Sequence, residues 1–128
     1  MMMNVKSAWL NLPVVNLEAS EDFYQQIGFE IKKSDDMMDK MRGIATLDNT
    51  VIMLIETKQF KKVSRLSKIG NNEALISLSL NTKAEVDQLL DLVESANGTV
   101  IERGTMHEGF YGGLFSDIDG HLYNIITM

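Results

Sequence analysis

The chain has 128 residues, twelve of them basic and eighteen acidic, which gives a net charge of −6. It contains no cysteine, which excludes disulfides, thiol nucleophiles and cysteine-bound zinc, and its acidic balance argues against a nucleic-acid partner. With a hydrophobic fraction of 45%, an ordinary globular value, and no apolar run longer than Val51 to Ile55, we expect one cytoplasmic domain over residues 1–128, without signal peptide or membrane span.

The first part of the chain, residues 5–56, carries strand and helix signals in a regular order. Alternating apolar residues over 8–14 predict a strand. Asn16 or Ser20 can cap the helix that follows, and Gly28 is a typical helix stop. Three further strands are expected at residues 29–33, 44–47 and 51–56, with a polar hairpin region over 34–40. The order is therefore β-α-β-β-β.

A basic connector follows over residues 57–72. It contains five basic residues and no acidic one: Lys58, Lys61, Lys62, Arg65 and Lys68. Such a run fits either an anion-binding or nucleic-acid surface, or a solvated connector, and we favour the connector because single charge runs are usually exposed. Phe60, Val63, Leu66 and Ile69 recur every third residue, and we expect them to pack against the body.

The last part, residues 73–128, repeats the order of the first. A strand is predicted over 74–80, and a helix over 83–95 begins at Asn81 or Thr82 and stops at Asn97-Gly98. The final strands are expected at residues 99–103, 111–116 and 121–127. Two β-α-β-β-β repeats indicate an α+β fold, in which the repeats pair into a curved mixed sheet with a central cleft for a small molecule.

Two motifs resemble those of the vicinal-oxygen-chelate superfamily, which includes glyoxalase I, bleomycin-resistance proteins and extradiol dioxygenases. The first is Asn16-Leu17-Glu18-Ala19-Ser20-Glu21-Asp22-Phe23-Tyr24 with Ile27-Gly28-Phe29, similar to the opening D-L-x-x-S-x-x-F-Y…L-G-F. The second is Phe115-Ser116-Asp117-Ile118-Asp119-Gly120-His121, similar to the F-x-D-P-D-G-[NH] turn before the last strand. More narrowly, the stretches 11–14 and 107–112 resemble a lactoylglutathione-lyase-like subgroup. The resemblance implies this fold and a homodimer.

Metal-using members of that superfamily hold one divalent ion with four side chains, one from the first and one from the last strand of each repeat. The resemblance places these positions on Trp9, Met53, Leu75 and Asn124. Indole and leucine offer no lone pair to a hard cation, a thioether prefers soft metals, and Asn124 adds one neutral oxygen. We therefore expect no metal site and no cofactor, which argues against glyoxalase I and dioxygenase chemistry.

Strand alternation places several candidate ligand-binding residues on the face opposite the helices. They are Trp9, Asn11, Met53, Ser77 and Asn124. A mainly apolar cleft with these few polar groups is typical of a pocket for a small, partly aromatic ligand. The alternative is a cleft filled by Trp9 and Met53 themselves. The net charge favours a cationic ligand.

The two histidines lie in different settings. His107 belongs to a loop expected over 105–109, within the stretch 106–113 whose three glycines predict a mobile hairpin over the cleft, where His107 and the neighbouring Tyr111 can contact a ligand or transfer protons. His121 follows a turn glycine and is expected to be exposed. Met37, Met38 and Met41 lie near the polar hairpin region and can form an adaptable pocket rim or a dimer contact, unless they cluster by chance.

The sequence thus predicts a small-molecule binder of the glyoxalase and bleomycin-resistance type that lacks the metal site. It resembles the members that sequester antibiotics, which need only enclose a ligand. The alternative function is a glyoxalase-like lyase or isomerase on an unidentified substrate, with His107 as the proton-transfer residue, Tyr111 assisting and a metal recruited at non-standard positions.

Overall fold

The computed structural model describes residues 2–48, 50–70 and 74–128. Repeat one consists of β1 (Leu10–Val14), α1 (Leu17–Gln26), β2 (Glu30–Lys32), the 3₁₀ turn η1 (Asp35–Met37), β3 (Met41–Ala45) and β4 (Val51–Glu56). Helix α2 (Thr57–Ser64) follows it. Repeat two consists of β5 (Leu75–Leu80), α3 (Lys83–Ser95), β6 (Thr99–His107), β7 (Phe110–Ser116) and β8 (Leu122–Thr127).

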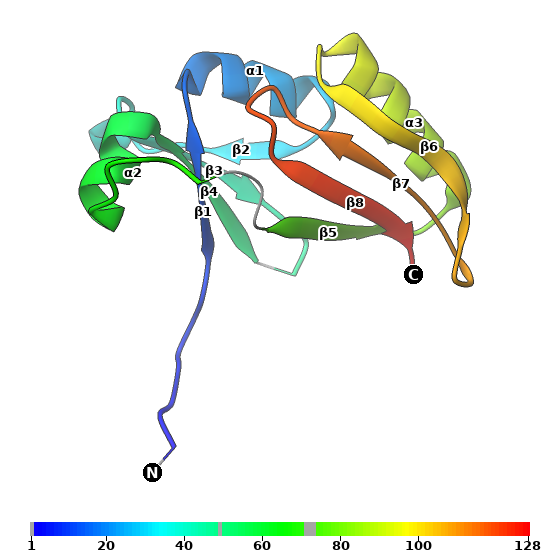
Figure 1. Ribbon diagram of the computed structural model, residues 1–128, viewed down its shortest axis with the longest axis horizontal. Helices are drawn as coiled ribbons and strands as arrows, with labels where there is room; N and C mark the ends of the chain where they lie inside the picture. Colours follow the sequence, from blue (N-terminus) through cyan, green and yellow to red (C-terminus); the bar gives the residue numbers. More distant parts are fainter. Residues whose placement is uncertain (1, 49, 71–73) are drawn as a thin grey trace.

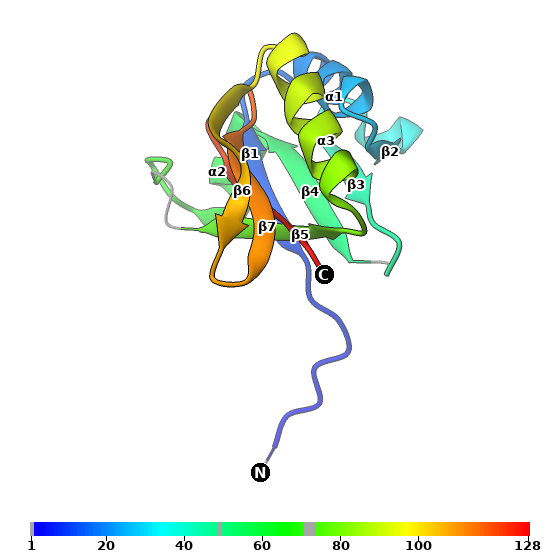
Figure 2. The same cartoon turned by 90° about the vertical axis from the view of Figure 1, so that its right-hand side faces the viewer.

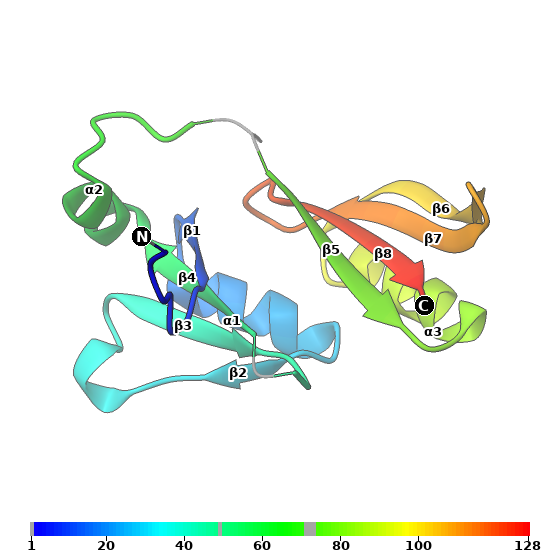
Figure 3. The ribbon, with the colours of Figure 1, turned by 90° about the horizontal axis from the view of Figure 1, so that it is seen from below.

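The strands form two mixed four-stranded sheets with the same topology. Repeat one has the order β1-β4-β3-β2 and repeat two the order β5-β8-β7-β6. In each sheet the first strand pairs in parallel with the last strand of its repeat, and the remaining pairs are antiparallel. The expected α+β fold of two β-α-β-β-β repeats is confirmed, and Figure 3 shows the repeats beside each other.

Each sheet has one face covered by a helix of its own repeat, α1 on the first and α3 on the second. The two helices lie side by side (Figures 1 and 2). Inward residues of both sheets share one hydrophobic core, exemplified by Leu54 and Ile125, which are fully buried. The opposite face of each sheet, here called the open face, carries the other alternate residues. Among the described residues, no helix is long and apolar enough to cross a membrane.

Capping hydrogen bonds and a glycine set the ends of the two long helices. The Asn16 side chain accepts a hydrogen bond from the Ala19 amide at 3.0 Å, which caps α1. Thr82 and Glu85 form a capping box at the start of α3. Gly28 follows α1 with a φ of +92°, a conformation that glycine adopts without steric cost.

The connector differs from the prediction. It begins as helix α2, because the Glu56 carboxylate accepts hydrogen bonds from the Lys58 and Gln59 amides at its first turn. The expected packing of its apolar residues is wrong for Val63, Leu66 and Ile69, which are exposed.

The stretch around His107 also differs from the prediction of a loop. Strand β6 continues through His107, which pairs with Phe110 of β7. Only Glu108 and Gly109 lie between the strands, and their φ values of +49° and +88° are those of a tight two-residue hairpin turn.

The turn at 117–121 of repeat two is joined to repeat one by a buried polar junction. The Asp117 carboxylate accepts hydrogen bonds from the Tyr24 hydroxyl at 2.5 Å and from the Asp119 and His121 amides, and it lies 2.7 Å from His121 Nδ1. The Tyr123 hydroxyl lies 2.9 Å from that of Tyr24. The His121 side chain is therefore only 15% exposed, which corrects the prediction of an exposed histidine.

Ionisation in this junction follows from burial and the neighbouring carboxylates. Burial, followed by the nearby Tyr123 and Asp117, raises the pKa of Tyr24 well above its usual value. Burial lowers the pKa of His121, but its hydrogen bond to Asp117 and the charges of Asp117 and Asp119 outweigh that effect, so the pKa is raised overall. Asp119 adds a second link, because its carboxylate accepts from the Val15 amide and the Ser20 hydroxyl at 3.0 and 3.2 Å.

Candidate functional site

Four of the seven predicted ligand-binding residues form two separate pairs on the open faces. Asn11 of β1 is the register partner of Met53 of β4. Ser77 of β5 is the partner of Asn124 of β8, and Asn124 Nδ2 donates to the Ser77 hydroxyl at 3.3 Å. Trp9 precedes β1 and is 60% exposed. One pair therefore belongs to each repeat.

Tyr111 and His107 lie on a different part of repeat two. The Tyr111 hydroxyl donates to Asp87 Oδ1 on α3 at 2.6 Å, and this hydrogen bond raises the pKa of Tyr111. Lys83 Nζ lies 5.5 Å from the centre of the Tyr111 ring. Tyr111 thus points to the helix side of its sheet. His107 is exposed at the tip of the β6–β7 hairpin.

Described residues form one pocket on the open face of repeat one and another between repeat one and α2. The first, here called the methionine pocket, has a volume of about 300 Å³ and is lined by residues of β2, η1, β3, β4 and the segments between them, among them Lys32, Ser34, Met37, Met41, Gly43 and Met53. The second, of about 330 Å³, lies between α2 and the β1–β4 pair and is lined by Asn11, Ile55, Phe60, Val63 and Ser64. None of the described residues of repeat two lines either pocket, so the residues predicted for one shared cleft are divided between different places.

The methionine pocket is hollow because β3 carries a glycine on its open face. Gly43 is the register partner of both Met53 and Lys32. A Cβ atom at this position would lie 3.3 Å from Met53 Sδ and 3.6 Å from Lys32 Cβ. Any larger side chain would therefore occupy the pocket.

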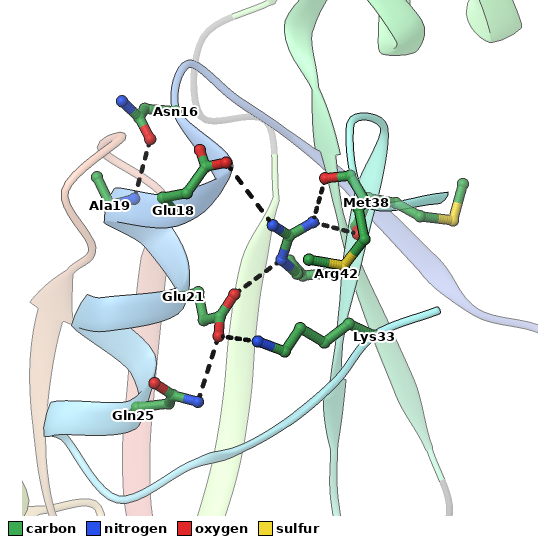
Figure 4. A network of polar contacts seen from close by, with 9 residues as sticks. Asn16, Glu18, Ala19, Glu21, Gln25, Lys33, Met38 and Arg42 are labelled. Carbon is green, nitrogen blue, oxygen red and sulfur yellow. Dashed lines mark hydrogen bonds and ion pairs between the residues drawn. The ribbon is translucent and has the colours of Figure 1, made fainter. Parts of the chain in front are cut away.

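The wall of the pocket is held from behind by a buried arginine (Figure 4). Arg42, 1% exposed, donates from Nε to Glu21 Oε1 at 2.8 Å and from Nη1 to the carbonyls of Met38 and Met41 at 2.7 and 3.0 Å. Lys33 Nζ donates to the other oxygen of Glu21 at 2.7 Å. One helix carboxylate thus ties both ends of the segment 34–41 to α1.

The charges in this network favour the ionised state of Glu21. The hydrogen bonds from Lys33 and then Arg42 lower the pKa of Glu21. Sequence reasoning missed Arg42, although its even spacing from Ile44 places both on the same, inward face of β3. A lone arginine in such a position indicates a buried ion pair.

The sequence profile of the Glyoxalase/Bleomycin resistance protein/Dioxygenase superfamily matches residues 6–125. The chain belongs to this superfamily. No curated protein sequence matches the chain significantly.

Several solved structures share the fold of this glyoxalase-superfamily chain. Hypothetical protein SA1046 from S. aureus is 43% identical, with a TM-score of 0.89 over 98% of this chain and 96% of that one. A lactoylglutathione lyase from Agrobacterium tumefaciens is 17% identical, with a TM-score of 0.67 over 97% and 96%. The fosfomycin resistance protein FosX from Mesorhizobium loti is 12% identical, with a TM-score of 0.68 over 98% and 94%. The last two show the fold alone.

The superfamily's divalent ion does not fit the residues present in this member. On the open faces, the pairs Asn11–Met53 and Ser77–Asn124 offer amide, thioether and hydroxyl groups but no carboxylate or imidazole. Among the described residues, no three His, Cys, Asp or Glu side chains are grouped so that they could hold an ion. A hard divalent cation prefers carboxylate and imidazole ligands, so we derive no reaction step through a metal.

Proposed function

We propose that the protein binds a small molecule in the methionine pocket without the metal ion of its superfamily. The observation that carries this proposal is the pocket of about 300 Å³ around Gly43 and Met53. Ligand sites are typically concave and mainly apolar, with a few polar groups that orient the ligand. Thioethers, a glycine and an alanine supply the apolar surface here, and Lys32 and Ser34 supply polar groups.

Binding fits this geometry better than catalysis does. A proton-transfer residue must come within hydrogen-bond distance of the reacting group. His107, the candidate for a lyase or isomerase, lines neither pocket, and the Tyr111 hydroxyl is engaged by Asp87. A protein that only sequesters a ligand needs an enclosing surface and no reactive side chain. We therefore propose a binding protein. We also propose that it acts in the cytoplasm.

We further propose that two copies form a homodimer. Large apolar side chains remain exposed on or beside both sheets, among them Trp9, Leu75 and Phe110. Exposed apolar surface of this kind is typical of protein contacts. Light scattering coupled to gel filtration should give twice the mass of 14.4 kDa, and a mass of one chain at micromolar concentration would contradict the dimer.

A thermal-shift screen tests the binding proposal. A fragment present at 100 times its Kd adds about 2.7 kcal/mol of stability, which for a chain of this length corresponds to a rise in Tm of about 10 °C. We expect hits with wild-type protein and none with Gly43→Leu, whose side chain fills the pocket. Gly70→Leu is the matched control, because a Cβ there meets no atom within 4 Å.

Two outcomes would overturn the proposal. One is that Gly43→Leu, still folded by circular dichroism, keeps every hit. The other is that protein purified without chelators retains a stoichiometric divalent ion, which would restore the metal-dependent lyase or isomerase as the leading function.

A further inference from the structure

One side of the methionine pocket is made of thioethers over a flat backbone. Met53 of β4, Met41 at the start of β3 and Met37 of η1 line the pocket together with Gly43. Because Gly43 has no side chain, its peptide plane forms part of the floor. Methionine sulfur makes favourable contacts with aromatic rings, and its flexible side chain adapts to their shape. This side therefore suits a flat ring.

The other side carries the polar groups of the β2 end. Lys32 lies on the open face, opposite Gly43. Ser34 is also extended, with φ −123° and ψ 135°, so strand alternation sends Lys32 and Ser34 to the same side. Lys33 points the other way, as its bond to Glu21 on α1 confirms. The Ser34 side chain makes no capping hydrogen bond to η1.

The charged residues that line the pocket are all basic, although the whole chain is acidic. They are Lys32, Lys33 and Arg42, and none of the described lining residues is an aspartate or glutamate. Glu21 neutralises charge behind the wall through its bonds to Lys33 and Arg42. Lys32 contacts only Glu30 among the described ion pairs, at 2.8 Å, and both side chains are about two-thirds exposed. An ion pair so exposed is weak, so a bound anion can replace Glu30.

We infer that the ligand of the methionine pocket is a flat aromatic molecule bearing an anionic group, such as an aromatic carboxylate. Its ring lies against the three methionines, and its anion reaches Lys32 and Ser34. This inference rests on the proposed binding function and specifies its ligand class. The proposed ligand is an anion, whereas the net charge of the chain favours a cationic ligand. The charges that line the pocket decide which ion binds there, and the total charge of the chain does not.

Three matched probes separate the ring from the charge. 2-Naphthoate has both features, decahydro-2-naphthoate has the anion with a saturated ring, and 2-(aminomethyl)naphthalene has the ring with a cation. The readout is the NMR signal of ¹³C-labelled methionine methyl groups in the whole protein. Each of the three pocket signals is assigned with a Met→Leu variant, and the exposed Met3 and Met128 serve as internal controls.

We expect 2-naphthoate to shift the methyl signals of Met37, Met41 and Met53 saturably, with ring-current displacements, and to bind at least tenfold more tightly than either other probe. Lys32→Gln should weaken 2-naphthoate about fivefold and strengthen the amine, because it removes the positive charge that attracts the anion and repels the cation. Lys62→Gln, on the exposed surface of α2, is the matched control and should change neither affinity.

The possible failures are distinguishable. Equal binding of the saturated acid would overturn the aromatic part of the inference, and tighter binding of the amine would overturn the anionic part. If other fragments move the pocket methyl signals while all three probes leave them in place, the ligand class is wrong but the proposed function stands. If no fragment of any kind moves them, the proposed function fails as well.

Discussion

Replacing Tyr24 by phenylalanine tests the buried junction that joins the two repeats. The Tyr24 hydroxyl has one hydrogen, which it donates to the Asp117 carboxylate, so the contact with Tyr123 must be donated by Tyr123. The hydrogen bonds therefore run in one direction, from Tyr123 to Tyr24 to Asp117. Removing the middle hydroxyl breaks both of them.

The expected loss of stability follows from the direction of these hydrogen bonds. A hydrogen bond to a charged group contributes about 1.5–3 kcal/mol, and a buried donor left without an acceptor costs about 1–3 kcal/mol. Tyr24→Phe should therefore lower the free energy of unfolding by about 3 kcal/mol, a large part of the 5–15 kcal/mol typical of a domain. Tyr123→Phe removes one neutral bond and should cost about 1 kcal/mol. In the double variant no hydroxyl is left unpaired, so adding Tyr123→Phe to Tyr24→Phe should cost nothing more or restore about 1 kcal/mol.

Urea unfolding followed by far-ultraviolet circular dichroism measures these differences. Tryptophan fluorescence is a poor probe, since Trp9 is largely exposed. Tyr111→Phe is the matched control, and it should leave stability nearly unchanged because its hydroxyl bonds to an exposed aspartate. If Tyr123→Phe costs as much as Tyr24→Phe, or if the two costs simply add, the direction of the hydrogen bonds is wrong.

Two further substitutions test ionised groups. Protonated His121 stabilises the fold because its pKa is raised, so its contribution is complete below the unfolded value near 6.5 and is lost as the pH rises through the folded pKa. In urea unfolding, His121→Gln should therefore lower the free energy of unfolding most near pH 6 and progressively less toward pH 9, and a loss independent of pH would contradict this. Glu21→Ala leaves the buried Arg42 guanidinium only main-chain acceptors and the distant, exposed Glu18. By the same assay it should lower the free energy of unfolding by about 3 kcal/mol, whereas the exposed control Asp36→Ala should change it very little. If Glu21→Ala and Asp36→Ala lower the free energy of unfolding equally, the network around Arg42 does not stabilise the fold.

The regular elements were predictable where several local signals agree. For α3, a capping box, a stripe of buried apolar residues and a terminal Asn97-Gly98 all point to the helix observed over Lys83–Ser95. Helix α2 lacks such agreement, because none of its described residues is buried and its start depends on the Glu56 cap. Similarly, the tight hairpin places Glu108 at a positive φ, which its residue type does not suggest.

The candidate site was only partly predictable. Alternation was sufficient to place Asn11 and Met53 on the open face of repeat one. For the methionines at 37, 38 and 41 the sequence left a pocket rim, a dimer contact and chance open, and Met37 and Met41 line the methionine pocket. The hollow itself was not predictable, because it requires the missing side chain of Gly43 opposite Met53. It also requires that the buried Arg42 hold the wall, a tertiary contact that no local pattern reveals.

The central claim is that the open face of repeat one binds a small molecule without a metal ion. The most direct measurement is a fragment titration of protein treated with a chelator, followed through the methionine methyl signals. We predict saturable shifts of Met37, Met41 and Met53 in the metal-free protein, unchanged when Zn²⁺, Mn²⁺ or Mg²⁺ is added back. Shifts that arise only after a divalent ion is restored would contradict the claim.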